Sequence, residues 1–449
     1  MKADVTILGG GPGGFAAALR AREHGFKTAL LEREAVGGVC LHRGCIPTKS
    51  LITNAFKKEL FPDMLLKKER IVSRLHQGAL ATLKKESVSL IQGEAKILKE
   101  HVVGVEGDTI DTKFILIATG SRPKEIPGVP FDGGKILSSD DLLEIKEIPQ
   151  SLCIIGGGPT GCEFASLFSL LGSHVMLVEA ASFLLPGHDE DISEALRKIF
   201  VRQGIELHLK EQVSSLELKN EEVVLTTSSG KKLATGKVLI SIGRVPNSSH
   251  LGLEGLNISL TNGFISVDDG LRTAIPSIFA VGDVIGKWPL AHVAAHQGRV
   301  AVDNMAGKKR VAEKTAIPEC VFTFPEIARV GLTEKEAEAK GSEIRIGRSS
   351  FFVSAKAQML EEKEGFIKLV GEARTGKLLG AHLLGPQVTE LLGELTLALR
   401  TGIAIPEIGE TIHPHPTLSE SVEEAARDFV QRGKSHDSDT FSNVASKTH

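Results

Sequence analysis

The chain has 449 residues, of which 41% are hydrophobic and 24% charged, and its formal net charge is -3 at pH 7. These proportions are typical of a globular protein of about two to four domains. A charge so close to neutral gives no reason to propose a nucleic acid or an anionic membrane as a partner. No apolar run is long enough to span a bilayer. The chain passes from Met1 almost directly into an apolar strand, without room for a targeting peptide, so we expect a cytoplasmic protein.

The first predicted strand, residues 4–8, runs into a glycine-rich turn and a helix of small residues, and a second predicted strand ends at Glu32. Gly9, Gly11 and Gly14 have the G-x-G-x-x-G spacing that binds dinucleotides between a strand and a helix. The first glycine makes the tight turn, the second lets a pyrophosphate approach, and the third lets the helix pack on the strand. The helix N-terminus then faces the phosphates, and the acid suits a ribose hydroxyl.

Two cysteines, Cys40 and Cys45, follow this fingerprint in the run GGVCLHRGCIPTK, which ends at Lys49. A thiol pair can hold two electrons as a disulfide bond, so the run predicts a redox dithiol beside a nucleotide cofactor such as a flavin. The chain has only five cysteines, an odd and sparse set that does not form a structural disulfide framework. Cys153 and Cys162 are expected to be buried as small hydrophobic residues.

The same pattern recurs where the predicted strand 152–155 runs into Gly156, Gly158 and Gly161. Glu179 ends the next predicted strand, and in both copies the acid follows the first glycine by 23 residues. A lone fingerprint is weak evidence, whereas two copies, each between a strand and a helix, strongly indicate two dinucleotide sites. No arginine follows Glu179 closely, so a 2′-phosphate would be repelled there and NAD is favoured over NADP.

Each copy also contains a later buried strand that exits through a glycine into a proline-containing turn, at Gly120 in the first copy and Gly243 in the second. A third such strand, residues 277–281, leads into Gly282 and Asp283. An aspartate at the carboxyl end of a strand can reach a cofactor hydroxyl in the crevice. Alone, Asp283 is a weak signal, because Gly-Asp is also a common turn.

These segments, in this order, resemble the disulfide-reducing flavoprotein family of pyridine nucleotide oxidoreductases, from about residue 4 to residue 432. The most specific motifs are the run from Cys40 to Lys49 and the run TIHPHPTLSE at residues 411–420. Residues 324–333 resemble the start of the dimerisation domain of the family. Two features depart from the family pattern: Pro414 stands where alanine is usual, and the segment 50–92 is short.

The resemblance implies an α/β fold with two Rossmann-like dinucleotide-binding domains and a C-terminal α+β dimerisation domain. The FAD-binding domain would be made of two separate stretches, with the redox disulfide in the first. The NAD-binding domain would lie between them, and the last residues would form a disordered tail. The expected ranges are 1–140 and 246–315 for the FAD-binding domain, 141–245 for the NAD-binding domain, 316–432 for the dimerisation domain and 433–449 for the tail.

The resemblance also implies a role for each matching residue, and no metal. Cys40 would exchange with substrate, and Cys45 would lie against the flavin. His415 would be the acid–base and Glu420 would orient it, whereas His413 is interpreted as structural or solvent-facing. The remaining residues are Lys49 and Glu163, which would steady charge at the flavin; Gly9, Gly11, Gly14, Glu32, Lys49, Gly120 and Asp283 for FAD; and Gly156, Gly158, Gly161, Glu179 and Gly243 for NAD.

The match is closest to the members of the family that oxidise dihydrolipoamide carried on lipoyl domains and reduce NAD+ to NADH. It therefore implies FAD and NAD as cofactors and the subunits of 2-oxoacid dehydrogenase complexes as partners. It further implies a homodimer in which the partner subunit supplies the acid–base histidine. A histidine suits that role because its unperturbed pKa lies near neutrality. Lys49 would lower the pKa of Cys45, because an adjacent cation favours the thiolate.

Other functions stay open within and beyond the family. Glutathione-type reductases expect a basic pocket for NADPH, which Glu179 argues against. Mercuric reductases expect a C-terminal cysteine pair, whereas no cysteine follows Cys320. A soluble transhydrogenase would lack one of the two redox cysteines. The chain could also serve mainly as a docking subunit or as a flavin sensor, and family preference alone selects lipoamide over another small disulfide.

Overall fold

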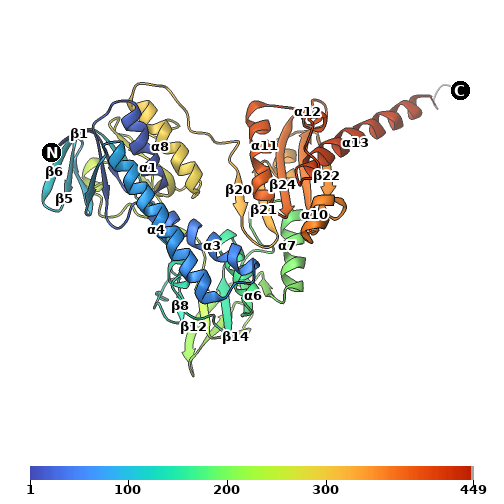
Figure 1. The fold of residues 1–449 in the computed structure, drawn as a ribbon, viewed down its shortest axis with the longest axis horizontal. Helices are drawn as coiled ribbons and strands as arrows, with labels where there is room; N and C mark the ends of the chain where they lie inside the picture. The colour runs from blue at the N-terminus through green and yellow to red at the C-terminus, as the bar shows by residue number, and fades with distance from the viewer. Residues whose placement is uncertain (446–449) are drawn as a thin grey trace. The chain divides into compact units, whose positions relative to one another are not determined.

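The computed structural model describes the backbone of residues 1–445 and the side chains of residues 1–433, and Figure 1 shows its ribbon. The chain forms two compact units, each built from three stretches of sequence. The predicted FAD-binding ranges fall almost entirely in unit 1 and the dimerisation range in unit 2, whereas the predicted NAD-binding range is divided between them. The predicted domain boundaries stay predictions. Unit 1 comprises Met1–Pro149, Leu218–Val223 and Thr235–Ala312, and unit 2 comprises Gln150–Glu217, Val224–Ala234 and the chain from Glu313 onward.

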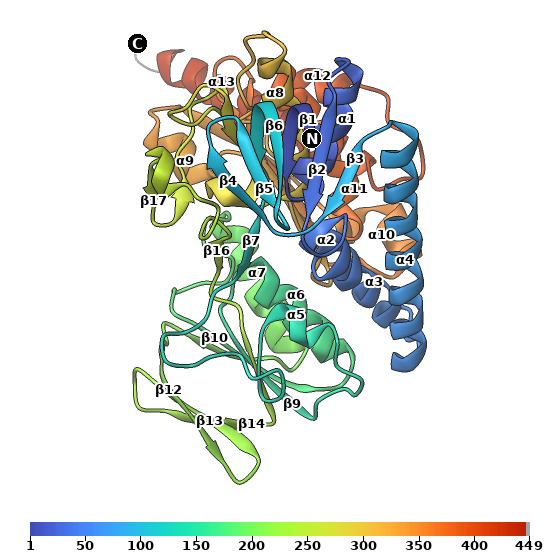
Figure 2. The same cartoon turned by 90° about the vertical axis from the view of Figure 1, so that its left-hand side faces the viewer.

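Unit 1 is organised by a seven-stranded sheet in the order β3-β2-β1-β6-β5-β4, with β19 also paired to β6 (Figure 2). The pairs among β3, β2, β1, β6 and β19 are parallel, and β4, β5 and β6 are antiparallel. Apolar side chains of β1 and β6 are buried, as expected for a parallel sheet covered on both faces. The strands are β1 Lys2–Leu8, β2 Thr28–Glu32, β3 Ser89–Gln92, β4 Ala95–Lys99, β5 Val102–Val105, β6 Asp108–Ile117 and β19 Ile278–Ala280.

The helices of unit 1 follow the predicted fingerprint and redox run. Small residues of α1 allow it to pack closely against α8. The short segment 50–92 forms the rest of α3, the 25-residue α4 and β3. The helices are α1 Pro12–Glu23, α2 Gly38–His42, α3 Cys45–Phe56, α4 Phe61–Lys85, α5 Ser139–Leu142, η1 Glu254–Leu256, η2 Gly282–Ile285 and α8 Ala291–Met305.

Short strands complete unit 1. The pair β7 and β16 is antiparallel, as is the pair β17 and β18, whereas β8 and β15 are parallel. Three further strands have residues in both units. The bounds in unit 1 are β7 Ser121–Pro123, β8 Ile136–Leu137, β15 Lys237–Ile240, β16 Arg244–Pro246, β17 Leu260–Thr261 and β18 Phe264–Ile265, and the strands divided between the units are β12 Val213–Lys219, β13 Glu222–Thr227 and β14 Lys232–Thr235.

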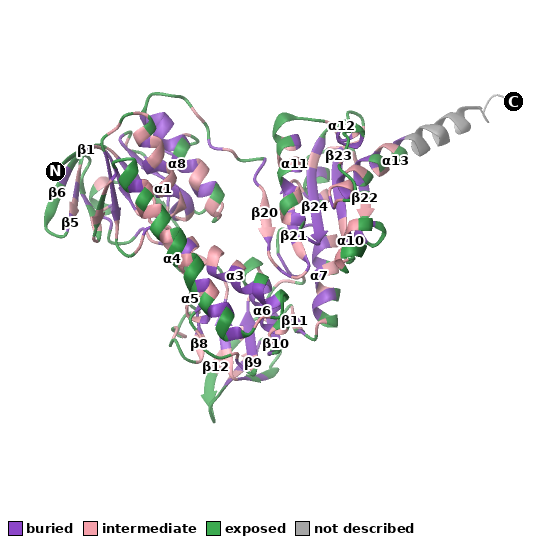
Figure 3. Ribbon diagram, viewed as in Figure 1, coloured by how far each residue is buried: buried purple, intermediate pink, exposed green. Residues whose placement is uncertain are grey.

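Unit 2 contains the second fingerprint and the antiparallel sheet β20-β21-β24-β23-β22. In the fingerprint region β9, β10 and β11 are parallel. The antiparallel sheet packs against α11 and α13, and Figure 3 shows β23 and β24 largely buried. The strands are β9 Ser151–Ile155, β10 His174–Glu179, β11 Glu206–Leu209, β20 Glu319–Val321, β21 Glu326–Gly331, β22 Ile344–Ser350, β23 Phe366–Glu372 and β24 Leu378–Gly385; the helices are α6 Pro159–Leu170, α7 Glu190–Arg202, α9 Glu334–Ala339, η3 Phe351–Val353, α10 Ala355–Leu360, α11 Val388–Thr401, α12 Ile405–Glu410 and α13 Glu420–Ala445.

The last helix, α13, is anchored at its N-terminal end, where Val422, Ala425, Ala426 and Phe429 are buried. The side chains beyond Gly433, and all of residues 446–449, lie outside the described residues, so the disorder predicted for the tail 433–449 stays a prediction. No helix among the described residues is long and apolar enough to cross a membrane.

A buried carboxylate ties α1 to α8. Asp303 is 1% exposed and accepts hydrogen bonds from Arg20 at 2.8 Å and Arg310 at 2.6 Å, with His24 Nε2 at 2.7 Å. Lys308 Nζ lies 3.4 Å away. Burial alone would raise the pKa of Asp303, but the hydrogen bonds from Arg310, His24 and Arg20 outweigh burial and hold this pKa well below its usual range.

Asp303→Asn should lower the free energy of unfolding by about 1–3 kcal/mol at neutral pH, because it leaves several cations without their shared anion. The folded-state pKa of Asp303 is depressed, so its contribution is present above the unfolded-state pKa of about 3.9 and is lost as the pH falls through the folded-state pKa. The difference in the free energy of unfolding between variant and wild type should therefore shrink on acidification. Denaturant unfolding at fixed protein concentration measures this free energy at each pH.

Glu23→Gln is the matched control, because Glu23 pairs with the same Arg20 but is largely exposed. Its effect should stay below about 1 kcal/mol. Equal losses in the two variants would contradict a structural role for the buried carboxylate.

Candidate active site

The two fingerprints share the same backbone geometry at their first and third glycines. Gly9 and Gly156 have φ angles of +102° and +109°, which favour glycine. A Cβ added at Gly14 would lie 1.9 Å from the carbonyl oxygen of Gly9, and one at Gly161 would lie 1.9 Å from that of Gly156. Only glycine therefore lets α1 and α6 pack so closely on the turn, as the sequence predicts.

The second glycine of each fingerprint faces open space. Gly11 and Gly158 are the N-cap residues of α1 and α6, and no side chain caps either helix. A Cβ added at either position would meet no protein atom within 4 Å. Uncapped N–H groups beside an open approach fit the pyrophosphate of a bound dinucleotide.

The acid of each copy is held in the same way. The Glu32 carboxylate accepts from the N–H groups of Gly10 at 2.7 Å and Glu34 at 2.8 Å. The Glu179 carboxylate accepts from Gly157 and Ala181, both at 2.6 Å. Each carboxylate oxygen keeps a further lone pair, so both acids can accept from a ribose hydroxyl.

Asp283 lies in a small polar network with two residues that the sequence analysis missed. Ser121 Oγ donates to Asp283 Oδ2 at 2.5 Å, and Arg244 Nε donates to Ser121 Oγ at 2.7 Å. Ser121 and Arg244 directly follow Gly120 and Gly243, which have φ angles of +69° and +108°. Their equivalent places after the glycine in the two repeats mark them as a related pair, although the repeat does not show that both lie beside Asp283.

The two redox cysteines lie on consecutive short helices, Cys40 in α2 and Cys45 as the first residue of α3, and both are present as thiols. Gly38, at the start of α2, has a φ angle of +57°, and a Cβ there would lie 2.9 Å from the Cα of Gly11. The redox turn is therefore packed directly on the first fingerprint.

The electrostatics of the pair distinguish the two sulfurs. A hydrogen bond with Cys45, followed by burial, raises the pKa of Cys40 far above its usual range, and the charge of Lys49 opposes this shift. Cys45 also stands at a helix N-terminus, which favours a thiolate. The raised pKa of Cys40 means that this thiol holds its proton more strongly than an ordinary cysteine does.

Lys49 and Glu163 lie in different units, on α3 and α6. Lys49 is one helical turn after Cys45. Glu163 is buried and accepts from the N–H of Phe322 at 3.0 Å. The predicted pairing of Lys49 with Glu163 beside the flavin stays a prediction.

Two histidines, His42 and His76, contact the backbone beside the redox turn, and the sequence patterns did not point to this pair. His42 Nε2 and His76 Nδ1 each lie 2.9 Å from the carbonyl oxygen of Val36, so both rings donate to it. The ring centroids are 5.1 Å apart. His42 lies between the two cysteines in sequence, whereas His76 comes from α4, and only the fold brings the two together.

His415 and Glu420 form the predicted base–orienter pair. His415 Nδ1 lies 2.7 Å from Glu420 Oε1, and the other carboxylate oxygen accepts from the N–H of Thr417 at 2.8 Å. The Thr417 hydrogen bond, then that of His415, lowers the pKa of Glu420, which therefore stays ionised. Because a carboxylate only accepts, Nδ1 carries a proton, and in a neutral ring Nε2 presents a lone pair. The His415 side chain is 73% exposed.

A cavity of about 290 Å³ in unit 2 contains none of the predicted site residues. Among its lining residues, Asp189, Asp191 and Glu334 are spaced closely enough to share a metal ion. Lys368, which is 1% exposed, instead places Nζ 2.9, 2.9 and 2.5 Å from these three carboxylates. Burial opposes its charge, but the three hydrogen bonds raise the pKa of Lys368, so this cluster is an internal ion-pair network.

Comparison with known proteins matches nearly the whole chain to one family. The family described as pyridine nucleotide-disulphide oxidoreductase matches residues 3–298, and its dimerisation domain matches residues 317–426. These matches confirm the predicted fold class of Rossmann-like FAD- and NAD-binding domains with a C-terminal dimerisation domain.

Similar individual proteins include dihydrolipoyl dehydrogenases and a related reductase. The dihydrolipoyl dehydrogenase of Chlamydia muridarum (strain MoPn / Nigg) is 39% identical over 447 residues, covering 94% of this chain and 96% of the relative. That of Bacillus subtilis (strain 168) is 38% identical, covering 94% and 97%. Among solved structures, the HOCl-induced flavoprotein disulfide reductase RclA from Escherichia coli has a TM-score of 0.89 at 30% identity, covering 94% of this chain and 99% of that chain.

Gly158→Val should raise the KM for NAD+ at least about tenfold, or about 1.4 kcal/mol, because the new side chain would occupy the open approach at the N-terminus of α6. The φ of Gly158 is -74°, so valine is not strained there, and the bound FAD and the unfolding midpoint should not change. Steady-state kinetics, flavin absorbance and thermal unfolding measure these three quantities.

Gly255→Val is the control, since Gly255 also faces open space but lies outside both fingerprints. An unchanged KM in Gly158→Val would show that the second fingerprint does not contact the pyrophosphate of NAD+.

Proposed function

Because the chain belongs to the pyridine nucleotide-disulphide oxidoreductase family and is a flavin-dependent disulfide oxidoreductase, we propose that its activity is that of a dihydrolipoyl dehydrogenase. It would oxidise protein-bound dihydrolipoamide to lipoamide and reduce NAD+ to NADH. The Cys40 and Cys45 pair, packed on the first fingerprint at the N-terminus of α3, is the observation that carries the proposal. The identity to two dihydrolipoyl dehydrogenases supports the choice of substrate.

In the proposed reaction His415 takes the proton from one thiol of the substrate through Nε2. The resulting thiolate attacks Cys40 in the Cys40–Cys45 disulfide, the S–S bond breaks, and Cys45 leaves as a thiolate. The second substrate thiol then displaces Cys40 and its proton passes to the Cys40 sulfur, which closes the substrate disulfide and leaves both electrons on the cysteine pair. The ionised Glu420 holds the Nδ1 proton and stabilises the imidazolium that forms.

The electrons then have to leave the cysteine pair. FAD, when bound, supplies the two-electron chemistry between thiolate and nicotinamide. Its pyrophosphate would lie against Gly11 and the N-terminus of α1, and its ribose against Glu32. We assign Gly9, Gly14, Gly120 and Asp283 to the same site, with Lys49 and Glu163 near the reactive ring.

NAD+ is the proposed second substrate, at the second fingerprint. Gly158 and the N-terminus of α6 would take its pyrophosphate, and Gly156, Gly161 and Gly243 would shape the turn around it. The Glu179 carboxylate suits a free ribose 2′-hydroxyl and would repel a 2′-phosphate, so NADP is not favoured.

A homodimer is the proposed assembly, supported by the match of residues 317–426 to the dimerisation domain of the family. Twofold symmetry would let each subunit supply His415 to the other. The proposed partners are lipoyl domains and the other subunits of 2-oxoacid dehydrogenase complexes, and the proposed location is the cytoplasm.

A second candidate function keeps the same redox pair but changes the substrate. The structural similarity to RclA, a flavoprotein disulfide reductase, covers 94% of this chain. Such a reductase would take electrons from NADH and pass them through Cys45 and Cys40 to an acceptor other than lipoamide.

Anaerobic titration of the purified protein with dihydrolipoamide, before NAD+ is added, should produce a long-wavelength absorbance band from the Cys45 thiolate beside oxidised flavin. When the thiols are then titrated after denaturation, the protein treated with dihydrolipoamide should show two more thiols than untreated protein that has been denatured in the same way. Cys45→Ser should abolish the band and lower lipoamide-dependent turnover at least about a thousandfold, because no disulfide can form.

Cys153→Ala is the control, because Cys153 is buried in β9 and the reaction does not use it. A flavin that responds to NADH but not to dihydrolipoamide would favour the second candidate. A Cys45→Ser variant with full lipoamide activity would rule out both.

A further inference from the structure

His413 lies in the loop that carries His415, and its side chain is buried there and contacts two acceptor groups. Its side chain is 4% exposed, although the neighbouring Ile412 is 95% exposed. Nδ1 lies 2.9 Å from the carbonyl oxygen of Thr411, and Nε2 lies 3.1 Å from Glu394 Oε1. Of the two alternatives left open for His413, a structural position and a solvent-facing one, the structure shows the first.

Both partners of the ring only accept hydrogen bonds. A carbonyl oxygen and a carboxylate have no proton to donate, so the ring makes either hydrogen bond only by donating from the nitrogen concerned. The ring lies between two carboxylates, because Glu423 Oε2 is 3.6 Å from Nδ1 on the other side. Arg427 NH2 is 2.5 Å from the second oxygen of Glu423, which extends the charge network.

These contacts tie together three elements of unit 2. Glu394 belongs to α11, Glu423 belongs to α13, and His413 belongs to the loop between α12 and α13. Beyond the proposed base, the loop is held by Thr417 and by the buried Leu418. Before the base, the buried His413 side chain anchors the loop between Glu394 and Glu423, and His415 follows only two residues later.

We propose that His413 is a positioning residue for the acid–base His415, acting through its clamp between Glu394 and Glu423. This inference rests on the proposed function, since it takes His415 as the base. His413 does not touch substrate; it fixes where the first half of the loop leaves α12, and hence where the exposed His415 ring is presented. A base displaced by about 1 Å can lose on the order of a hundredfold in rate.

His413→Asn should lower the kcat for dihydrolipoamide oxidation about 10- to 100-fold and shift the pH dependence of kcat/KM. NADH oxidation by ferricyanide, which needs bound FAD but no base, should stay within about twofold, as should flavin content. His413→Gln, whose longer side chain carries its amide NH2 nearer to Glu394 than asparagine does, should recover part of the loss. The measurements are steady-state kinetics between about pH 6 and about pH 9, flavin absorbance and thermal unfolding.

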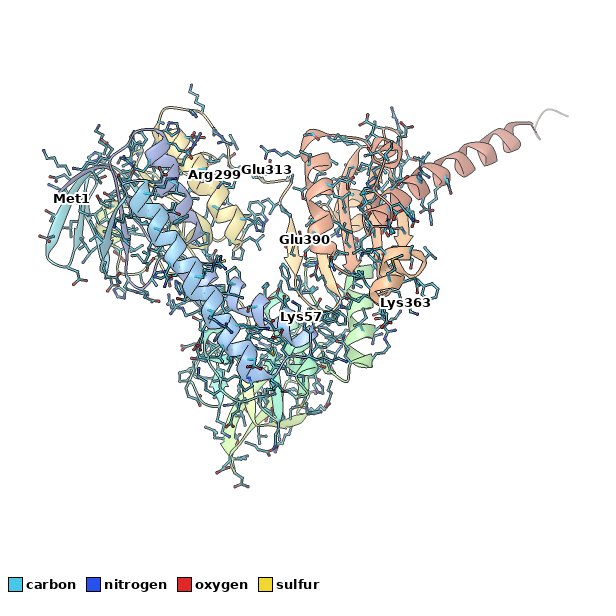
Figure 4. All side chains as sticks on the ribbon, in the orientation of Figure 1. Met1, Lys57, Arg299, Glu313, Lys363 and Glu390 are labelled. Atoms are coloured by element: carbon cyan, nitrogen blue, oxygen red, sulfur yellow. The ribbon has the colours of Figure 1, made fainter. Side chains whose placement is uncertain are left out.

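Glu394→Gln tests the clamp without removing the histidine, and should reproduce a smaller loss with the same direction of pH shift. Glu390→Gln is the matched control: Glu390 is exposed on the same helix, one turn earlier, and is labelled in Figure 4. It should leave all activities unchanged.

A double-variant cycle separates positioning from general destabilisation. Once His415→Gln has removed the base, adding His413→Asn should cost little further dihydrolipoamide activity. Equal loss of the ferricyanide activity, or additive losses in the double variant, would overturn the positioning role. Full activity of His415→Gln would instead overturn the proposed function, so the two failures are distinguishable.

Discussion

The strands, helices and cofactor sites of this protein depend on one steric constraint, the lack of a β-carbon at Gly14 and at Gly161. A Cβ at either position would lie 1.9 Å from the carbonyl oxygen that begins the turn. Because glycine has no Cβ, α1 and α6 can start directly at the carboxyl ends of β1 and β9, with the free N–H groups of each helix directed outward. The acid at the end of the next strand is held in place by the N–H group of a residue within the same turn. One backbone arrangement thus provides the phosphate site and the ribose acceptor together.

The redox pair is built on the first of these turns. Gly38, at the start of α2, packs so closely on Gly11 that a Cβ there would lie 2.9 Å from the Cα of Gly11, and Cys45 stands at the start of α3. The same packing that positions a pyrophosphate therefore positions the thiols. The hydrogen bond between the sulfurs, followed by burial, raises the pKa of Cys40, and Cys45 stands at a helix N-terminus, a position that favours a thiolate.

Buried charges connect distant elements in both units. Asp303 joins α1 to α8, and Lys368 joins β23 to the residues preceding and beginning α7 and to α9. His413 joins α11 to α13. Asp303 and Lys368 are each surrounded by groups of opposite charge, as a low-dielectric interior requires, and removing one partner leaves the others uncompensated. Such clusters specify one arrangement of their elements, which a catalytic loop needs more than an ordinary surface loop does.

The sequence by itself determined the local features. Spacing within about 25 residues was enough to predict both fingerprints, the acids Glu32 and Glu179 and the cysteine pair, and the family resemblance added His415 with Glu420. All these features are local, because they depend on one turn, one strand–helix unit or one short loop. The tertiary structure alone decided the contacts between residues far apart in the chain. Ser121 and Arg244 beside Asp283, His76 beside His42, and Glu394 against His413 come from separate elements, and neither spacing nor composition encodes which helix faces which loop. Long-range packing selects these partners, since a buried charge or ring nitrogen has to find its acceptor wherever the fold places one.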